Sequence, residues 1–202
     1  MKLLAFTDLH ANLRAIEHLA QESERHKVDF LVCAGDFSMF GNGQEQMLKE
    51  LNAIGKPIIL IHGNHEHEDL LEHQISKYKN IIWVHKDTYE YQNFIFIGFG
   101  GGGFATHEPE FKSFAAKHAK RKNIILVTHQ PPYGTALDEL YGDYVGNKDF
   151  RSFIEDAKPL VAICGHIHEN QNKHSVVSKT LVINPGPMGK ILEIEEQDAQ
   201  KK

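Results

Sequence analysis

The sequence predicts an α/β protein. Short apolar runs typical of buried strands alternate with segments whose apolar residues recur at helical spacing. One of these runs, residues 58–61, is followed at Gly63 by a residue that lets the backbone turn sharply. Ligands of open α/β sheets bind at the carboxyl ends of strands, so the polar residues that follow such runs are candidates for a functional site.

The first half of the chain predicts three strands, at 3–6, 29–34 and 58–61, each followed by a helix. Asn12 can cap the first helix, and Gly55 can end the second. The apolar residues expected to pack these helices onto a sheet are Leu13, Ile16, Leu19 and Ala20; Met47, Leu48, Leu51 and Ile54; and Leu70, Leu71 and Ile75.

The second half predicts a different pattern of strands. Segments rich in β-branched and aromatic residues predict strands at 81–84, 88–91 and 94–99, with a turn at 92–93. The other expected elements are helices around Phe111 and Phe150 and strands at 124–127, 160–164, 174–177, 180–184 and 190–195. Parallel strands with helices, followed by a largely antiparallel set, suggest two packed sheets flanked by helices.

Length and composition predict one compact domain over residues 1–202, with a tail that frays from about residue 196. The formal net charge of −5 and the lack of a long basic block argue against a nucleic-acid partner. The apolar N-terminal run ends at Asp8 without a small-residue cleavage pattern, so it predicts a first strand. No run is long enough for a membrane span.

The two cysteines, Cys33 and Cys164, each lie in an apolar strand just before a glycine. This pattern favours free, buried thiols in a cytoplasmic protein over a disulfide.

Five of the predicted strands end in side chains that commonly bind metals. These side chains are Asp8 and His10, Asp36, Asn64 and His65, His129, and His166 and His168. Solvated polar residues at strand ends are common, but five endings of this one chemical type are difficult to explain by packing alone.

Asp8-x-His10, Gly35-Asp36, Gly63-Asn64-His65-Glu66, His129 and Gly165-His166-x-His168 resemble, in this order, the five motifs of the calcineurin-like metallophosphoesterases. Residues 128–135, 165–169 and 184–186 are similar to a compact branch of that family that includes predicted phosphoesterases related to class III cyclic-nucleotide phosphodiesterases. The resemblance implies a four-layer α/β/β/α sandwich of two mixed sheets flanked by helices.

The resemblance also implies two divalent metal ions as cofactors. Asp8, His10, Asp36 and His168 would hold one ion, and Asp36, Asn64, His129 and His166 would hold the other. Asp36 would then bridge the two ions, as the two oxygens of a carboxylate allow. Oxygen and imidazole ligands without a thiolate suit Mn, Fe, Co, Ni or Zn.

The implied activity is that of a binuclear-metal-dependent phosphoesterase, in which hydroxide activated by the metals attacks phosphorus. His65 and Asp36 would be catalytic residues, with His65 stabilising the transition state or protonating the leaving oxygen. Many family members have Asp at the position of Glu66, where it is pictured orienting the histidine. Glu is one methylene longer, so the sequence leaves this supporting contact open.

The expected substrate contacts are Asn64, His65, His107 and Tyr133. Tyr133 lies in a long segment, 130–147, of the kind that is usually either functional or disordered. The glycine-rich segment 98–103 predicts either a flexible turn or a substrate-side lid that includes Phe104 and His107.

The expected partner is a small phosphate ester. A phosphodiester is favoured, because none of the four arginines adjoins a motif. A phosphomonoester is the alternative substrate. An interaction module without turnover is the alternative of another class, but such a module is expected to lack His65 or some of the ligands, and here none is missing. The oligomeric state is left open, with a homodimer as one option.

Overall fold

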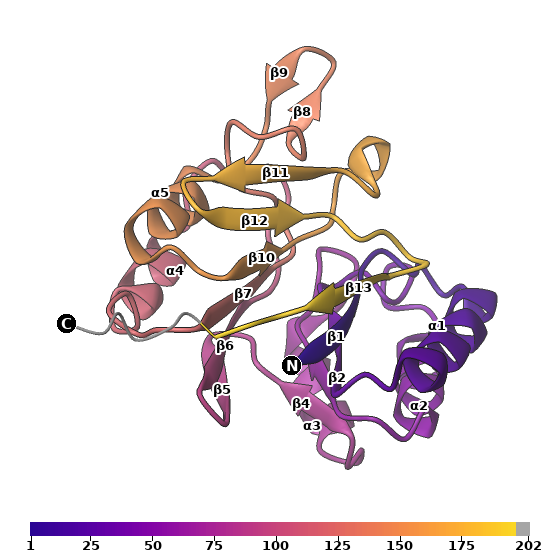
Figure 1. Cartoon of the computed structure of the whole chain (residues 1–202). Helices are drawn as coiled ribbons and strands as arrows, with labels where there is room; N and C mark the ends of the chain where they lie inside the picture. Colours follow the sequence, from indigo (N-terminus) through magenta and orange to yellow (C-terminus); the bar gives the residue numbers. More distant parts are fainter. Residues whose placement is uncertain (197–202) are drawn as a thin grey trace.

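The computed structural model describes residues 1–196, in which two large sheets pack face to face with helices on their outer surfaces (Figure 1). The elements in chain order are β1 (Lys2–Phe6), α1 (Leu13–His26), β2 (Phe30–Cys33), α2 (Gln44–Ala53), β3 (Ile58–Leu60), α3 (Glu68–Ile75), β4 (Ile81–Trp83), β5 (Asp87–Tyr91), β6 (Phe94–Phe99), α4 (Pro109–Ala115), β7 (Ile124–Thr128), β8 (Glu139–Leu140), β9 (Asp143–Tyr144), α5 (Lys148–Ala157), β10 (Val161–Ile163), the 3₁₀ turn η1 (His168–Asn170), β11 (His174–Val177), β12 (Thr180–Ile183) and β13 (Lys190–Glu193).

Both large sheets are mixed. The five-stranded sheet has the order β13-β1-β2-β3-β4, in which only β13 is antiparallel to its neighbour. The six-stranded sheet has the order β11-β12-β10-β7-β6-β5, with antiparallel strands only at its two edges. The expectation of a largely antiparallel second set is therefore wrong. The helices α4 and α5 connect β6 to β7 and β7 to β10, and a helical crossover makes these pairs parallel.

The core confirms the four-layer α/β/β/α sandwich. Side chains alternate along each strand, so that Leu4 and Phe6 of β1 pack toward α1 and α2, whereas Leu3 and Ala5 pack between the sheets. In the second sheet, Ile95 and Ile97 of β6 face the layer that contains α4 and α5. Burial on both faces explains why these strands appear in the sequence as almost continuous apolar runs.

The helix signals of the sequence are confirmed in most details. The Asn12 side chain caps α1 by accepting a hydrogen bond from Ala15 N at 3.2 Å. Leu71 and Ile75 of α3 are buried, but Leu70 is 55% exposed, so its predicted packing is wrong. The 92–93 turn joins β5 to β6, with Gln92 at a φ of 53°.

The strand ends that carry the polar residues lie level with one another. The register pairs Phe6 with Cys33 and Cys33 with Leu60, and in the other sheet it pairs Val127 with Ile163. The loops that follow these strands therefore meet at one end of the sandwich.

Cys33 and Cys164 are free and buried, as predicted, and burial raises the pKa of each thiol well above its usual value. Within residues 1–196, the helices are too short or too polar to cross a bilayer. The predicted frayed tail lies, apart from residue 196 itself, outside the described residues.

Two glycines pack the loops after β2 and β3 against each other. Gly35 has a φ of +93°, and a Cβ atom at this position would approach Gly63 N to 2.5 Å and Gly63 Cα to 2.7 Å. Both atoms belong to the backbone, so the collision could be relieved only if the loop that contains Gly63 moved as a whole.

We expect Gly35→Ala to destabilise the protein more than Gly55→Ala. Gly55 has a φ of +78° with nothing within 4 Å of the added carbon, so that variant isolates the cost of the left-handed backbone, about 1–2 kcal/mol. The backbone collision at Gly35 should bring the loss in unfolding free energy to about 2–5 kcal/mol. Urea unfolding of metal-free protein measures both values, and equal midpoints would contradict a tight loop contact.

Candidate active site and metal centre

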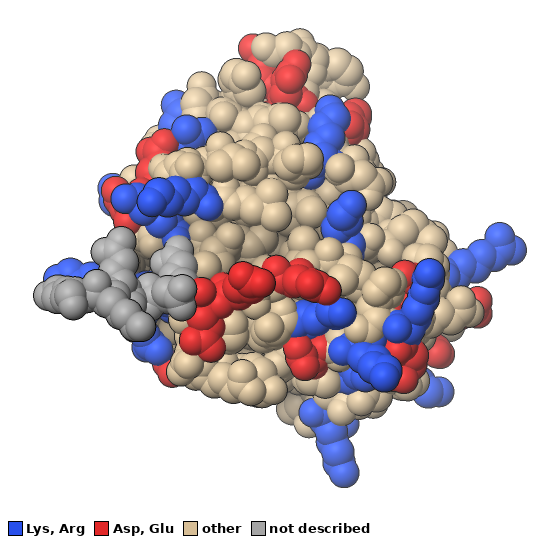
Figure 2. All heavy atoms as spheres, viewed as in Figure 1, with Lys and Arg blue, Asp and Glu red and all other residues tan. Residues whose placement is uncertain are grey.

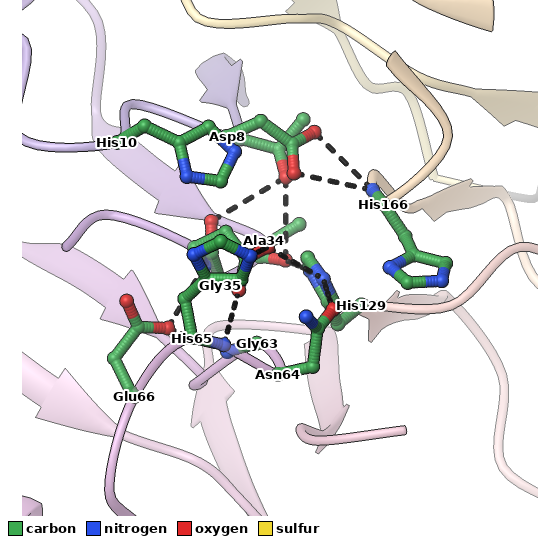
Figure 3. Close-up of polar contacts among 12 residues, drawn as sticks. Asp8, His10, Ala34, Gly35, Gly63, Asn64, His65, Glu66, His129 and His166 are labelled. Atoms are coloured by element: carbon green, nitrogen blue, oxygen red, sulfur yellow. Dashed lines mark hydrogen bonds and ion pairs between the residues drawn. The ribbon is translucent and has the colours of Figure 1, made fainter. Parts of the chain in front are cut away.

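The structure brings the predicted ligand residues together at the carboxyl end of the strands (Figure 3). In the five-stranded sheet they follow β1, β2 and β3, and in the six-stranded sheet they follow β7 and β10. The residues are Asp8, His10, Asp36, Asn64, His129, His166 and His168, with His65 beside Asn64.

Several of these residues have an unusual backbone conformation. Asp8, His10, Asp36 and His166 have φ values of 56°, 46°, 51° and 72°. Residues other than glycine seldom adopt such φ values, and these values persist only where surrounding contacts enforce them. Here Asp8 N donates to Gly35 O at 3.1 Å and His10 N donates to Asp36 O at 3.0 Å. These bonds lock the loops after β1 and β2 to each other.

The clearest sign of a cation site lies at His129. The Nδ1 atom of His129 is 2.8 Å from Ala34 O, a carbonyl that can only accept, so Nδ1 carries the hydrogen. In the neutral ring, Nε2 then presents a lone pair to Asp36 Oδ2 at 3.2 Å and to Asn64 Oδ1 at 3.0 Å. In that neutral form three electron-rich atoms converge, so the place between them favours a cation, either a metal ion or the proton of a charged His129 ring.

A second convergence involves His10, His168 and Asp8. The Nε2 atoms of the two histidines are 2.8 Å apart, and His168 Nε2 is 3.8 Å from Asp8 Oδ1. Around both convergences, the described structure gives no hydrogen-bond partner to the buried atoms His10 Nδ1, His65 Nδ1 and His166 Nε2. Orphaned ring nitrogens next to carboxylates are what a metal site without its ions would present.

Ionisation of the ligands agrees with this description. Burial lowers the pKa of His10, and burial with His129 nearby lowers the pKa of His166 to about 4, so both rings keep free lone pairs at neutral pH. Burial also acts to lower the pKa of His129, but its hydrogen bond to Asp36 and the charge of Asp36 raise it to about 9. A proton thus occupies the place between Asp36 and His129 where a metal would lie.

The pKa values of the Asp36 and Asp8 carboxylates are shifted in opposite directions. Burial works against ionisation of Asp36, but the hydrogen bond and charge of His129 outweigh it and lower the pKa of Asp36 to about 2. Burial and the nearby Asp36 raise the pKa of Asp8, although His129 partly compensates. Asp8 and Asp36 are two negative charges in one dry site, and a divalent ion would stabilise both.

Glu66 holds the loops that carry the ligands. Its carboxylate accepts hydrogen bonds from Asp36 N at 2.9 Å, from Gly63 N at 2.8 Å, and from both the N and Oγ atoms of Ser38 at 2.8 Å. His65 is positioned by other residues, since its backbone N donates to Asp36 Oδ1 at 2.9 Å and its Nε2 lies 3.9 Å from Asp36 Oδ2. The supporting contact that the sequence left open is therefore made to the loop backbones.

His107 and Tyr133 make contacts with other parts of the molecule. His107 Nδ1 is 3.3 Å from Asp149 Oδ2, and the Tyr133 ring contacts Tyr144 and lies 4.9 Å from Lys148 Nζ. The segment that contains Tyr133 is ordered around the buried carboxylate of Asp138 and includes the β8–β9 hairpin, which projects from the molecule (Figure 1).

The glycine-rich segment 98–103 packs over two histidines. Gly101 N donates to His62 O at 2.9 Å, and a Cβ atom on Gly100 would approach His62 Nδ1 to 2.5 Å. Gly100 N donates to His85 Nδ1 at 2.8 Å, which places the hydrogen of a neutral His85 on Nε2, 3.0 Å from Glu68 Oε1. His62 and His85 therefore support this segment, and Glu68 lies next to His85.

Sequence reasoning missed Phe40. Its ring stacks on His65 with centroids 3.9 Å apart and an interplanar angle of 25°. The only available signal was its place in the loop after Asp36, between that ligand and the turn residues Gly41 and Gly43.

Comparison with known proteins identifies relatives in sequence and in fold. The chain is 30% identical to the uncharacterized protein MJ1162 of Methanocaldococcus jannaschii, over 93% of this chain and 88% of that protein. Its fold is similar to TT1561 of Thermus thermophilus, with a TM-score of 0.73 and 16% identity over 92% of this chain and 88% of that one. It is also similar to a dimetal phosphatase from Danio rerio, with a TM-score of 0.65 and 13% identity over 91% and 86% of the two chains.

The family model for calcineurin-like phosphoesterases matches residues 1–170, which include all of the converging side chains. The resemblance seen in the motifs is confirmed, and the chain belongs to the calcineurin-like phosphoesterase family.

Proposed function

We propose that this protein is a binuclear-metal-dependent phosphoesterase that hydrolyses a P–O bond of a phosphodiester. The observation that carries the proposal is the convergence of His129 Nε2 with Asp36 Oδ2 at 3.2 Å and Asn64 Oδ1 at 3.0 Å, around a place that a metal ion could take from the His129 proton. Family membership supports the hydrolase class.

The ligand sets proposed for the two ions overlap at Asp36. Asp8, His10, Asp36 and His168 would hold the first ion, and Asp36, Asn64, His129 and His166 the second. In support, ligand atoms of Asp8, His10 and His168 lie within 4.8 Å of one another, and so do those of Asp8, Asp36 and His129. The similarity of the fold to a dimetal phosphatase also favours two ions. The ligand chemistry suits Mn, Fe, Co, Ni or Zn.

Two divalent ions at these residues would make water nucleophilic at neutral pH and offset the charge of the phosphate. In the hydrolysis, a water oxygen bonds to phosphorus and the bond to the leaving oxygen breaks. The leaving oxygen takes the bonding electron pair and a proton. His65 is the residue proposed to supply that proton, because it belongs to neither proposed ligand set and its Nε2 lies 3.9 Å from Asp36 Oδ2.

The arginines support a diester substrate. Arg25 pairs with Glu22, Arg121 pairs with Glu90, and Arg151 pairs with Glu155 while donating to the Tyr133 and Gly134 carbonyls. A dianionic monoester usually requires a bidentate arginine, whereas a diester carries one charge fewer. Phosphomonoesterase activity is the alternative within the same mechanism.

The proposal extends to domain, location and partners. We assign residues 1–202 to one metallophosphoesterase domain, because β11, β12 and β13, which follow the matched region, complete the two large sheets. Two free buried cysteines favour the cytoplasm. On the face shown in Figure 2, basic and acidic side chains are interspersed, which argues against a nucleic-acid partner.

A protein-interaction module without turnover is the alternative of another class. It is disfavoured because every proposed ligand and His65 are present and converge at one site. Asp8, His10, Asp36 and His166 have φ values that are costly for residues other than glycine. A catalytic role explains this cost more readily than a protein-binding surface does.

Removal of the shared carboxylate should empty both metal sites. We expect Asp36→Asn to lose most of both ions, whereas His10→Ala should mainly lose one, since only Asp36 belongs to both sets. Elemental analysis of purified protein measures the ratio, and His174→Ala, an exposed histidine on β11, serves as the control with unchanged metal content. Two full equivalents of metal in Asp36→Asn would refute the shared role.

Loss of His65 should impair turnover while both metals stay bound. We expect His65→Gln to lose about 10²–10⁴ in kcat, the usual contribution of a general acid or of a transition-state donor. If His65 protonates the leaving oxygen, the loss should be larger for diphenyl phosphate than for bis(p-nitrophenyl) phosphate, whose leaving group needs less protonation. Loss of metal with unchanged turnover per bound ion would instead make His65 a ligand.

Diesters should be better substrates than monoesters. We expect kcat/KM for bis(p-nitrophenyl) phosphate to exceed that for p-nitrophenyl phosphate, because within residues 1–196 none of the arginines contacts a proposed ligand, and Arg14 lies on α1. The comparison is made with Mn and repeated with Ni. A preference for the monoester under both metals would overturn the diester assignment, and activity on neither substrate with both sites filled would favour the interaction module.

A further inference from the structure

Two exposed phenylalanines contact the proposed catalytic site. Phe40 is 66% exposed and stacks on His65, and Phe104 is 63% exposed with its ring centroid 4.9 Å from that of His166. The Phe40 ring has one face against His65, the Phe104 ring is tilted by 58° to the His166 ring, and both have a large surface open to solvent. Exposed aromatic surface beside a catalytic centre is a common sign of ligand contact.

The backbone fixes Phe40 in this position. Its φ of 49° lies in the left-handed region, an outlier for a bulky side chain that costs about 1–3 kcal/mol. Met39 and Asn42 close the turn with reciprocal backbone hydrogen bonds of 3.2 and 2.9 Å, and Gly41 N donates to His65 O at 2.8 Å. The turn is therefore tied directly to the residue on which the ring stacks.

The backbone also anchors Phe104 on both sides. Before it, Gly101 N is bonded to His62 O at 2.9 Å. After it, Ala105 O accepts from Asn147 Nδ2 at 3.0 Å and Thr106 O accepts from Lys148 N at 2.9 Å. These bonds hold the segment that presents Phe104 beside His166, so its exposed ring is carried by an anchored stretch of chain.

The two rings flank different parts of the cluster. Phe40 contacts His65, whose ring lies 4.7 Å from that of His10. Phe104 contacts His166, whose ring lies 5.2 Å from that of His129. His65 and His166 stand on opposite sides of Asn64 and His129 in Figure 3.

We propose that Phe40 and Phe104 are specificity-determining residues that stack on the two planar organic groups of an aromatic phosphodiester, such as two aryl or nucleobase-bearing arms. This inference rests on the proposed function. Because His65 is assigned to the leaving oxygen, Phe40 takes the arm that leaves, and Phe104 beside His166 takes the arm that stays on phosphorus. The reaction yields a free alcohol or phenol and a phosphate monoester.

A pair of substrates with the same leaving group separates the two roles. Bis(p-nitrophenyl) phosphate has two aryl arms, whereas methyl p-nitrophenyl phosphate keeps the leaving arm and replaces the retained one by methyl. For the wild type, we expect the KM of the two-armed ester to be lower by about tenfold, within the range measured for one stacked base. Phe104→Ala should erase this advantage without changing the KM for the methyl ester, while Phe40→Ala should raise both KM values.

Control variants distinguish stacking from general disturbance. Phe40→Tyr and Phe104→Tyr should keep wild-type KM values, because the flat face remains, whereas Phe40→Leu and Phe104→Leu should behave like the alanine variants. Val176→Ala removes a side chain of similar exposure, 67%, from β11 and should change neither KM.

Binding without turnover provides an independent measurement. In protein stripped with EDTA, saturation-transfer NMR should detect the aryl protons of bis(p-nitrophenyl) phosphate, with weaker signals in Phe40→Ala and Phe104→Ala and unchanged signals in Val176→Ala. Unchanged signals together with unchanged KM ratios would overturn the stacking roles. Absence of hydrolysis by metal-loaded enzyme would count against the proposed function alone, because the NMR signals do not depend on turnover.

Discussion

The candidate site depends on the buried carboxylate of Glu66. Desolvation of this group is unfavourable, and burial together with the nearby Asp36 raises its pKa. Hydrogen bonds from the backbone of Asp36, Ser38 and Gly63 compensate for the lost water. Because these donors belong to the loops after β2 and β3, one side chain sets the position of Asp36 relative to Asn64 and His65. A carboxylate one methylene shorter would have to draw the two loops closer together to keep the same bonds.

From Asp36 the contacts continue into the second sheet. Its Oδ2 faces His129, and the other side of the His129 ring is bonded to Ala34 at the end of β2. His129 thus contacts the first sheet through both ring nitrogens. Gly165 N in turn donates to His129 O at 2.8 Å, so the His166 loop is positioned by the same strand. The proposed ligands are held by backbone and by one another, which is the arrangement expected of a preorganised centre.

Much of this arrangement could be predicted from the sequence. The strands buried on both faces leave a clear apolar pattern, and the ordered polar endings from Asp8 to His168 indicate both the site and the family. Strand direction in the second sheet was predicted wrongly, because the helices expected around Phe111 and Phe150 were not interpreted as crossovers that make β6, β7 and β10 parallel. Most partners of Glu66 were also hidden, since three of its four hydrogen bonds come from backbone N–H groups, which every residue type except proline has. Phe40 was missed for a related reason: its stacking on His65 depends on a left-handed backbone conformation, which a phenylalanine does not signal.

The order of the ligands along the chain has a consequence for biosynthesis. Asp8 and His168 meet in space although most of the chain separates them, and β1 also pairs with β13, near the other end of the described chain. A nascent chain that has emerged only as far as β6 already contains Asp8, Asp36 and Asn64, but it has none of the histidines supplied by the second sheet. Domains generally fold as units during synthesis. Binding of metal by the two complete ligand sets proposed above would therefore be a late event, because both sheets must first be translated and packed.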